Sequence, residues 1–156
     1  MAKDSKTLKQ FKFTEAQETW LQALESGEFK QGRSHLHQID SKTKKETYCC
    51  LGVACKLLGP KANKPERWTN SFDTVSYGPG KNAADLPPSL VKKLKMRGPD
   101  GQIWGEGPEV TDQDKTTYLA KTLVSLNDSA RWSFKKIAKW IRKNPEQIFT
   151  NNDPKD

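Results

Sequence analysis

The sequence has little apolar material and no long apolar run. Only 33% of its 156 residues are hydrophobic, and the mean hydropathy is −0.88. No segment approaches the roughly 18 consecutive apolar residues of a membrane-spanning helix, so we expect no membrane span. The charged N-terminus is not followed by the apolar stretch of a secretory signal. The five tryptophans nevertheless indicate a folded chain, because disordered chains contain few aromatic residues. We expect a small core with long polar connections.

Cysteine is also scarce, and its spacing excludes the common structural uses of the residue. The chain has three cysteines, at positions 49, 50 and 55. They cannot complete an intrachain set of disulfides, which is typical of a protein kept in a reducing cytoplasm. Neighbouring cysteines on a helix diverge by about 100° and, together with His35 and His37, do not match the spacing of a zinc site. Because no phosphate-binding loop of the form G-x-x-x-x-G-K-[ST] occurs either, we expect neither a metal ion nor a cofactor.

Acidic residues are outnumbered by basic ones. The chain has 27 lysines and arginines against 19 aspartates and glutamates, a formal net charge of +8. A surplus of this kind favours partners that carry negative charge. The length fits one domain, which we place at residues 14–149. A flexible lysine-rich segment (1–13) is expected before it, and a polar tail (150–156) after it.

Helix signals recur along the chain. Thr14-Glu15-Ala16-Gln17 has the form of a capping box, and the helix that it begins should end at Gly27. Pro88 suits the first turn of a short helix that reaches Leu94. Residues 112–126 begin with two aspartates and continue with leucines at helical spacing, which predicts a further helix.

Residues 48–58 form the most apolar segment, and we expect them to be a buried helix. Only Lys56 is charged, and the apolar side chains point all round the helix axis. Gly52 costs such a helix about 1 kcal/mol relative to alanine, so we expect another backbone to approach closely there. The predicted fold is α+β, with about four helices around this Cys-containing helix and a small antiparallel sheet. The strands of the sheet are expected within residues 33–39, 72–77 and 102–104.

The order of several motifs resembles that of a group of small accessory proteins encoded by tailed bacteriophages. The shared elements are CCLGV at 49–53 and LND at 126–128, followed by SFxxIAxxI at 133–141, within a similarity that spans about residues 14–143. The resemblance implies a phage origin, action in the cytoplasm of an infected bacterium and a role outside the virion. Phage proteins of this size often block host enzymes or defence systems or sequester nucleotide signals, so the resemblance points to host takeover or counter-defence.

A catalytic cysteine is the main alternative to a binding function. Cys49 or Cys50 would lie near a helix N-terminus, where the helix dipole stabilises a thiolate. His35 could then act as the base of a small hydrolase or transferase. Burial in an apolar segment would instead raise the thiol pKa and make the cysteines inert. We favour the structural interpretation and expect a non-enzymatic protein.

The last helix carries the strongest functional signal. Ser133 should cap a helix over 134–143 with an apolar stripe on one side. Residues 129–143 contain six cations and no acid, and the cations of the helix lie opposite its apolar stripe. Such a face with an adjacent indole suits a nucleic acid, an anionic nucleotide or an acidic patch of a host protein. The predicted face consists of Arg131, Lys135, Lys136, Lys139, Trp140, Arg142 and Lys143.

Two further regions could contribute to binding. Arg67 and Trp68, in the long middle loop, pair a cation with an aromatic ring, and we include them in the predicted site. Lys42, Lys44 and Lys45 form a second basic region. We expect a protein that binds an anionic partner without catalysis, and a remaining possibility is inhibition of a host protein through a surface unrelated to charge.

Overall fold

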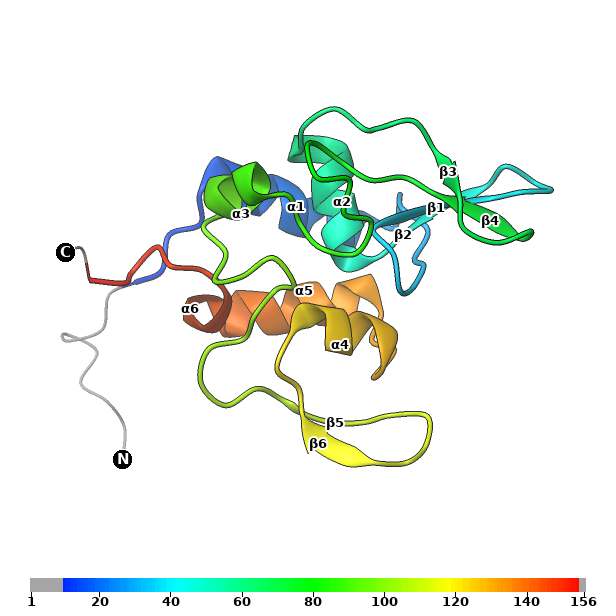
Figure 1. Ribbon diagram of the computed structural model, residues 1–156. Helices are drawn as coiled ribbons and strands as arrows, with labels where there is room; N and C mark the ends of the chain where they lie inside the picture. The colour runs from blue at the N-terminus through cyan, green and yellow to red at the C-terminus, as the bar shows by residue number, and fades with distance from the viewer. Residues whose placement is uncertain (1–9, 155–156) are drawn as a thin grey trace.

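The computed structural model describes residues 10–154 and has the predicted α+β architecture (Figure 1). Within these residues there are six helices, two of them very short, and two antiparallel sheets. The helices are α1 (Glu15–Ser26), α2 (Cys50–Leu58), α3 (Pro88–Leu94), α4 (Leu123–Asp128), α5 (Phe134–Lys143) and α6 (Pro145–Ile148). The strands are β1 (His37–Asp40), β2 (Glu46–Tyr48), β3 (Glu66–Arg67), β4 (Phe72–Thr74), β5 (Glu109–Thr111) and β6 (Thr117–Leu119).

The helices whose ends are marked by a capping residue, a glycine or a proline form where the sequence predicts them. Thr14 caps α1, and its hydroxyl accepts the Gln17 N–H while the Gln17 side chain accepts the Thr14 N–H, which completes the capping box. Gly27 ends the helix in the left-handed region, at φ 79°. Pro88 occupies the first turn of α3, as predicted.

Helix α2 is buried, and its glycine has the predicted role. All residues from Cys50 to Cys55 are buried. A side chain at Gly52 would overlap the carbonyl oxygen of Leu36, so this position admits only glycine. The helix begins two residues later than expected, because Tyr48 belongs to β2 and Cys49 is the N-cap.

The four-stranded sheet has the order β2-β1-β4-β3, with every pair antiparallel. Strand β4 lies in the predicted segment 72–77. In the predicted segment 33–39, the strand begins only at His37. Ser34 has a left-handed backbone, at φ 74°, which interrupts an extended chain before that point. The expected strand at 102–104 is absent from the described residues. Gln102 there makes only an isolated bridge with Thr122, and the next two amides bond to two different segments.

The prediction of a helix over residues 112–126 is wrong. Its first half is the turn and second strand of the β5–β6 hairpin, and α4 begins only at Leu123, capped by the Thr122 hydroxyl. The Asp112 carboxylate accepts the N–H groups of Asp114 and Thr116, which closes the chain into a turn. The acidic residues that were expected to begin a helix therefore serve the hairpin.

The helices form two layers (Figure 1). Helices α1, α2 and α3 lie above α4, α5 and α6, the four-stranded sheet extends sideways from α2, and the β5–β6 hairpin projects beyond α4. Helix α2 packs against α1, α3 and α4, and α5 packs against α1 and α4. No helix within residues 10–154 has the length and apolar character needed to cross a membrane.

Residues near both ends of the described part pack against the rest of the molecule. Phe11 and Phe13, from the segment expected to be flexible, pack against the buried ring of Phe149, while residues 1–9 of that segment lie outside the described residues. In the predicted polar tail, Asp153 pairs with the Arg97 guanidinium at 2.7 Å. Residues 155–156 of the tail also lie outside the described part.

Candidate functional site

Helix α5 separates an apolar face from a basic face, as the sequence predicts. Its apolar stripe, which faces α1 and α4, is buried and consists of Phe134, Ile137, Ala138 and Ile141. The lysines on the other side are exposed: Lys135, Lys136, Lys139 and Lys143. The Ser133 hydroxyl accepts the Lys136 N–H at 3.1 Å and fixes the start of the helix.

The four lysines share a surface hollow of about 520 Å³ with two indoles, and we call this set of residues the basic face. Its complete lining is Trp132, Lys135, Lys136, Lys139, Trp140 and Lys143. The Lys136 ammonium lies 4.4 Å from the centre of the Trp132 ring, a cation–π contact that holds both side chains. Among residues 10–154, no carboxylate lies within salt-bridge distance of these four lysines. The hollow therefore offers positive charge that the described residues do not neutralise.

Arg142 does not belong to this open face, contrary to the sequence-based prediction. Its guanidinium bonds to Glu18 at 2.6 Å and to Glu25 at 2.7 Å, both on α1. These hydrogen bonds raise the pKa of Arg142 and lower the pKa of Glu18. Arg142 joins α5 to α1, and its charge is already compensated within the molecule.

The other predicted binding residues lie apart from the hollow. Arg131 is exposed in a left-handed conformation, at φ 56°, just before α5, but does not line the hollow. Arg67 and Trp68 lie at the β3 edge of the sheet, well away from α5 in Figure 1. Their neighbourhood encloses only about 90 Å³, and Trp68 packs edge-on against His35 at 4.6 Å. Of the predicted set, the structure thus gathers the α5 lysines and Trp140.

The cysteines are packed inside the molecule. Cys49 is 5% exposed, and its sulfur accepts the Gly52 N–H at the start of α2. Cys50 is fully buried, and its thiol points to the Leu123 carbonyl at 3.8 Å. Burial raises the pKa of Cys49 to about 12 and that of Cys50 well above its ordinary value. Neither thiol has a hydrogen bond with an imidazole among the described residues.

The two histidines serve separate networks. His35 contacts the Gln38 side chain at 2.9 Å and packs against Trp68 and Phe72. His37 lies between the Tyr77 hydroxyl at 2.8 Å and the Glu46 carboxylate at 2.6 Å. Burial lowers the pKa of both imidazoles, and in His37 this effect outweighs the opposing influence of Glu46. A neutral His37 that donates a hydrogen bond from Nε2 to the Glu46 carboxylate can accept one at Nδ1 from the Tyr77 hydroxyl, so both ring nitrogens have a partner.

Asn127, from the LND motif, is a buried structural centre, and no local pattern in the sequence predicts its hydrogen-bond partners. It lies in the last turn of α4, which runs to Asp128, and its side-chain oxygen accepts the Cys50 N–H at 3.2 Å and the Gln31 amide N–H at 2.8 Å. Its amide group donates to the Gly32 carbonyl at 2.9 Å and to Asp128. Two of the three motifs that carry the resemblance, CCLGV and LND, are therefore hydrogen-bonded to each other.

Within residues 10–154, no group of three or more His, Cys, Asp or Glu side chains is placed to hold a metal ion. The lining of the basic face consists of lysines and tryptophans, so it can attract anionic groups and pack planar or apolar groups against indole.

Residues 13–145 match the model of a family described as "Domain of unknown function (DUF8296)", and because the match covers most of the chain, the protein belongs to this family. No curated protein and no solved structure matches the chain.

Proposed function

We propose that this member of the family is a phage-encoded, non-enzymatic accessory protein that binds an anionic partner through the basic face of α5. The partner would be a nucleic acid, a nucleotide signal or an acidic host protein. A protein that blocks its partner simply by binding to it needs no catalytic group. Such blocking suits a role in host takeover or counter-defence in the bacterial cytoplasm.

The observation that carries this proposal is the charge of the hollow on α5. Four lysines converge there with Trp132 and Trp140, and no acidic residue lines the hollow. Lys135, Lys139 and Lys143 follow one another at intervals of four residues, or about 6 Å along the helix. A row of ammonium groups at this spacing can contact successive charges of an extended polyanion. Because the apolar side of α5 is buried, the lysines face outwards on a fixed helix.

The two tryptophans of the basic face are not equally accessible to a nucleotide base. Lys136 already covers the Trp132 ring, so Trp140, half-buried and free of such a contact among the described residues, is the better platform for a base. The described residues do not favour sequence-specific reading of duplex DNA, because within residues 10–154 the helix after α5 is α6, which with four residues is too short to act as a recognition helix. The proposal therefore concerns attraction by charge, with stacking as an added contribution for nucleotides.

Charge reversal with a matched control tests the proposal. The variant carries Lys135→Glu, Lys136→Glu and Lys139→Glu, and the control carries Lys61→Glu, Lys64→Glu and Lys121→Glu, three exposed lysines that do not line the hollow. Both change the net charge equally. Binding of single-stranded DNA, a cyclic dinucleotide and polyglutamate is measured at physiological salt by fluorescence anisotropy or calorimetry.

We expect at least one of the three probes to bind, and the α5 variant to weaken it by more than about tenfold while the control does not. If both variants weaken binding of the probe equally, the weakening comes from the change in net charge alone, and the proposal is contradicted. Binding that survives the α5 variant for every probe would also contradict it. Insensitivity of binding to ionic strength would point instead to an uncharged contact surface.

A further inference from the structure

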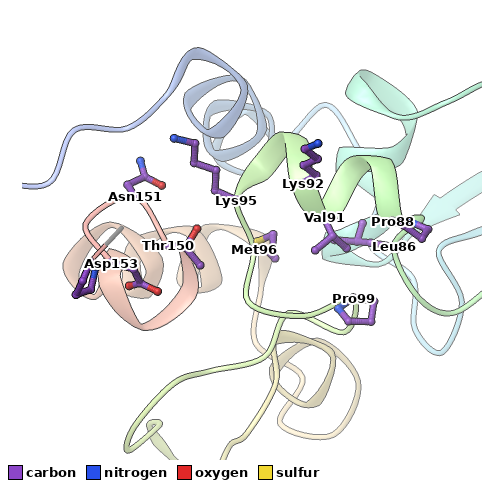
Figure 2. Close-up of a pocket in the computed structure, with 11 residues that line it drawn as sticks. Leu86, Pro88, Val91, Lys92, Lys95, Met96, Pro99, Thr150, Asn151 and Asp153 are labelled. Atoms are coloured by element: carbon purple, nitrogen blue, oxygen red, sulfur yellow. The ribbon is translucent and has the colours of Figure 1, made fainter. Parts of the chain in front are cut away.

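A second cavity lies between α3 and the C-terminal segment, and it shares no residue with the basic face. Its volume is about 770 Å³ (Figure 2). The α3 side supplies Val91 and Lys92, and Thr150 and Asp153 lie across from them. We call this cavity the α3 groove. The remaining lining residues are Leu86, Pro88, Lys95, Met96, Pro99, Asn151 and Pro154.

The walls of the α3 groove are held together by backbone contacts. The Thr150 N–H donates to the Lys95 carbonyl at 2.9 Å, and Met96 forms a β-bridge with Phe149. On the other side, the Leu86 N–H donates to the Pro99 carbonyl at 2.9 Å. Since these bonds join the segments on both sides, the groove exists before a ligand arrives, and binding requires little ordering of the protein.

The groove combines an apolar floor with a positive edge. Leu86, Val91 and Met96 supply aliphatic and thioether surface. Lys92 and Lys95 are exposed at the edge, and no carboxylate of residues 10–154 lies within salt-bridge distance of either ammonium.

The acid in the groove lining does not cancel this charge. Asp153 is bound by Arg97 through both carboxylate oxygens, at 2.7 and 2.8 Å. The Arg97 guanidinium also donates to the carbonyls of Glu146 and Phe149, so the pair is fixed at the C-terminal end of the groove. The two lysines are therefore available to a ligand.

We propose that the α3 groove binds a short acidic segment of a partner protein, with apolar side chains on the floor and carboxylates at Lys92 and Lys95. Charge complementarity selects an acidic segment. The lining contains no aromatic ring on which a base could stack, so a peptide fits this groove better than a nucleotide. The site is independent of the basic face, and the protein could hold a partner at each.

The test uses the full chain and a fluorescein-labelled peptide that alternates leucine and aspartate. One control peptide replaces the aspartates by lysine, and a second replaces the leucines by serine at unchanged charge. The protein variants are Lys92→Glu and, as a matched control, Lys93→Glu on the same helix. Lys93 does not line the groove, and its ammonium is directed to the Leu58 carbonyl. Methyl NMR signals of Leu86, Val91 and Met96 report occupancy in the unmodified protein.

We expect the acidic peptide to shift these three methyl signals and to bind about tenfold more weakly to Lys92→Glu than to Lys93→Glu. Both control peptides should bind more weakly than the acidic peptide. The proposal is overturned if the methyl signals do not move or if the serine peptide binds equally well. It is also overturned if the two variants weaken binding alike, or if the indole signals of Trp132 and Trp140 move instead. The methyl shifts need no variant, so they decide the question even if a substitution impairs folding.

Discussion

Asn127 is a single buried residue whose side chain joins three separate segments. Its buried amide connects the end of α4 to Cys50 at the start of α2 and to the loop that contains Gln31 and Gly32. Removal of the amide leaves buried N–H and C=O groups without partners, each of which costs about 1–3 kcal/mol. We predict that Asn127→Ala lowers the free energy of unfolding by about 3 kcal/mol, measured by urea denaturation.

Asn152 provides the control for this prediction. Its amide bonds only to the exposed Glu146 side chain. Asn152→Ala should change stability by less than about 0.5 kcal/mol. Equal effects of the two substitutions would show that Asn127 is not the structural centre described here.

Because the three cysteines are buried, we expect their thiols to react slowly in the folded protein. With the pKa of Cys49 raised to about 12, only about one thiol in ten thousand is ionised at pH 8. We predict that a disulfide reagent labels the three cysteines slowly in native protein and rapidly in urea. Fast labelling of Cys49 or Cys50 in the native state would revive the hypothesis of a catalytic cysteine. Cys49→Ser and Cys50→Ser would then be expected to abolish an activity without a loss of thermal stability.

His37 predicts a specific dependence of stability on pH. Burial lowers its pKa in the folded state below the ordinary value of 6.5, so the unfolded chain binds a proton first as the pH falls. Its contribution to stability is complete above about pH 6.5 and is lost as the pH falls towards the lowered folded pKa. We predict that His37→Gln is less stable than the natural protein at pH 7 but loses less stability between pH 7 and pH 5. Parallel stability curves would contradict this role.

At the scale of helices, α1 and α5 are joined by the Arg142 cluster. Glu18 and Glu25 are each more than a third exposed, so solvent screening limits the strength of this network. We predict that Arg142→Gln lowers the free energy of unfolding by about 1–2 kcal/mol and leaves polyanion binding nearly unchanged.

Lys139 on the same helix should behave in the opposite way. Lys139→Gln should leave stability within about 0.5 kcal/mol and weaken polyanion binding. If Arg142→Gln weakens binding as much as Lys139→Gln does, the division of α5 into a paired and a free set of cations is wrong.

The helices that the sequence predicted correctly are those whose ends are set by local contacts. Thr14, Ser133 and Pro88 act within a few residues of their own position, so their effect can be read from the sequence. The segment 112–126 failed because two local signals compete there. Asp112 can complement a helix dipole or close a turn, and the threonines and tyrosine that follow favour a strand.

At the scale of the whole molecule, the candidate site was predictable only in part. The helical spacing of Phe134, Ile137 and Ile141 was enough to place the lysines on the outer side of α5. Arg142 does not belong to the basic face because its guanidinium bonds to Glu18 and Glu25, which lie more than a hundred positions earlier in the chain. No local sequence pattern predicts a contact between residues so far apart. The α3 groove likewise exists only because Thr150 folds back onto Lys95.

The five tryptophans allow the central claim to be tested across the whole molecule at once. Each indole gives one N–H signal in an NMR spectrum, and the five occupy different places. Trp132 and Trp140 line the basic face, and Trp20 is buried with its N–H bonded to the Cys50 carbonyl. Trp68 and Trp104 are exposed elsewhere, at 59% and 61%.

The most direct measurement is a titration of these indole signals with single-stranded DNA, a cyclic dinucleotide and polyglutamate at physiological salt. We predict that a probe that binds shifts Trp132 and Trp140 first and leaves Trp20 and Trp68 in place. If all three probes leave Trp132 and Trp140 unmoved, or if Trp68 responds before them, the basic face of α5 is not the binding surface.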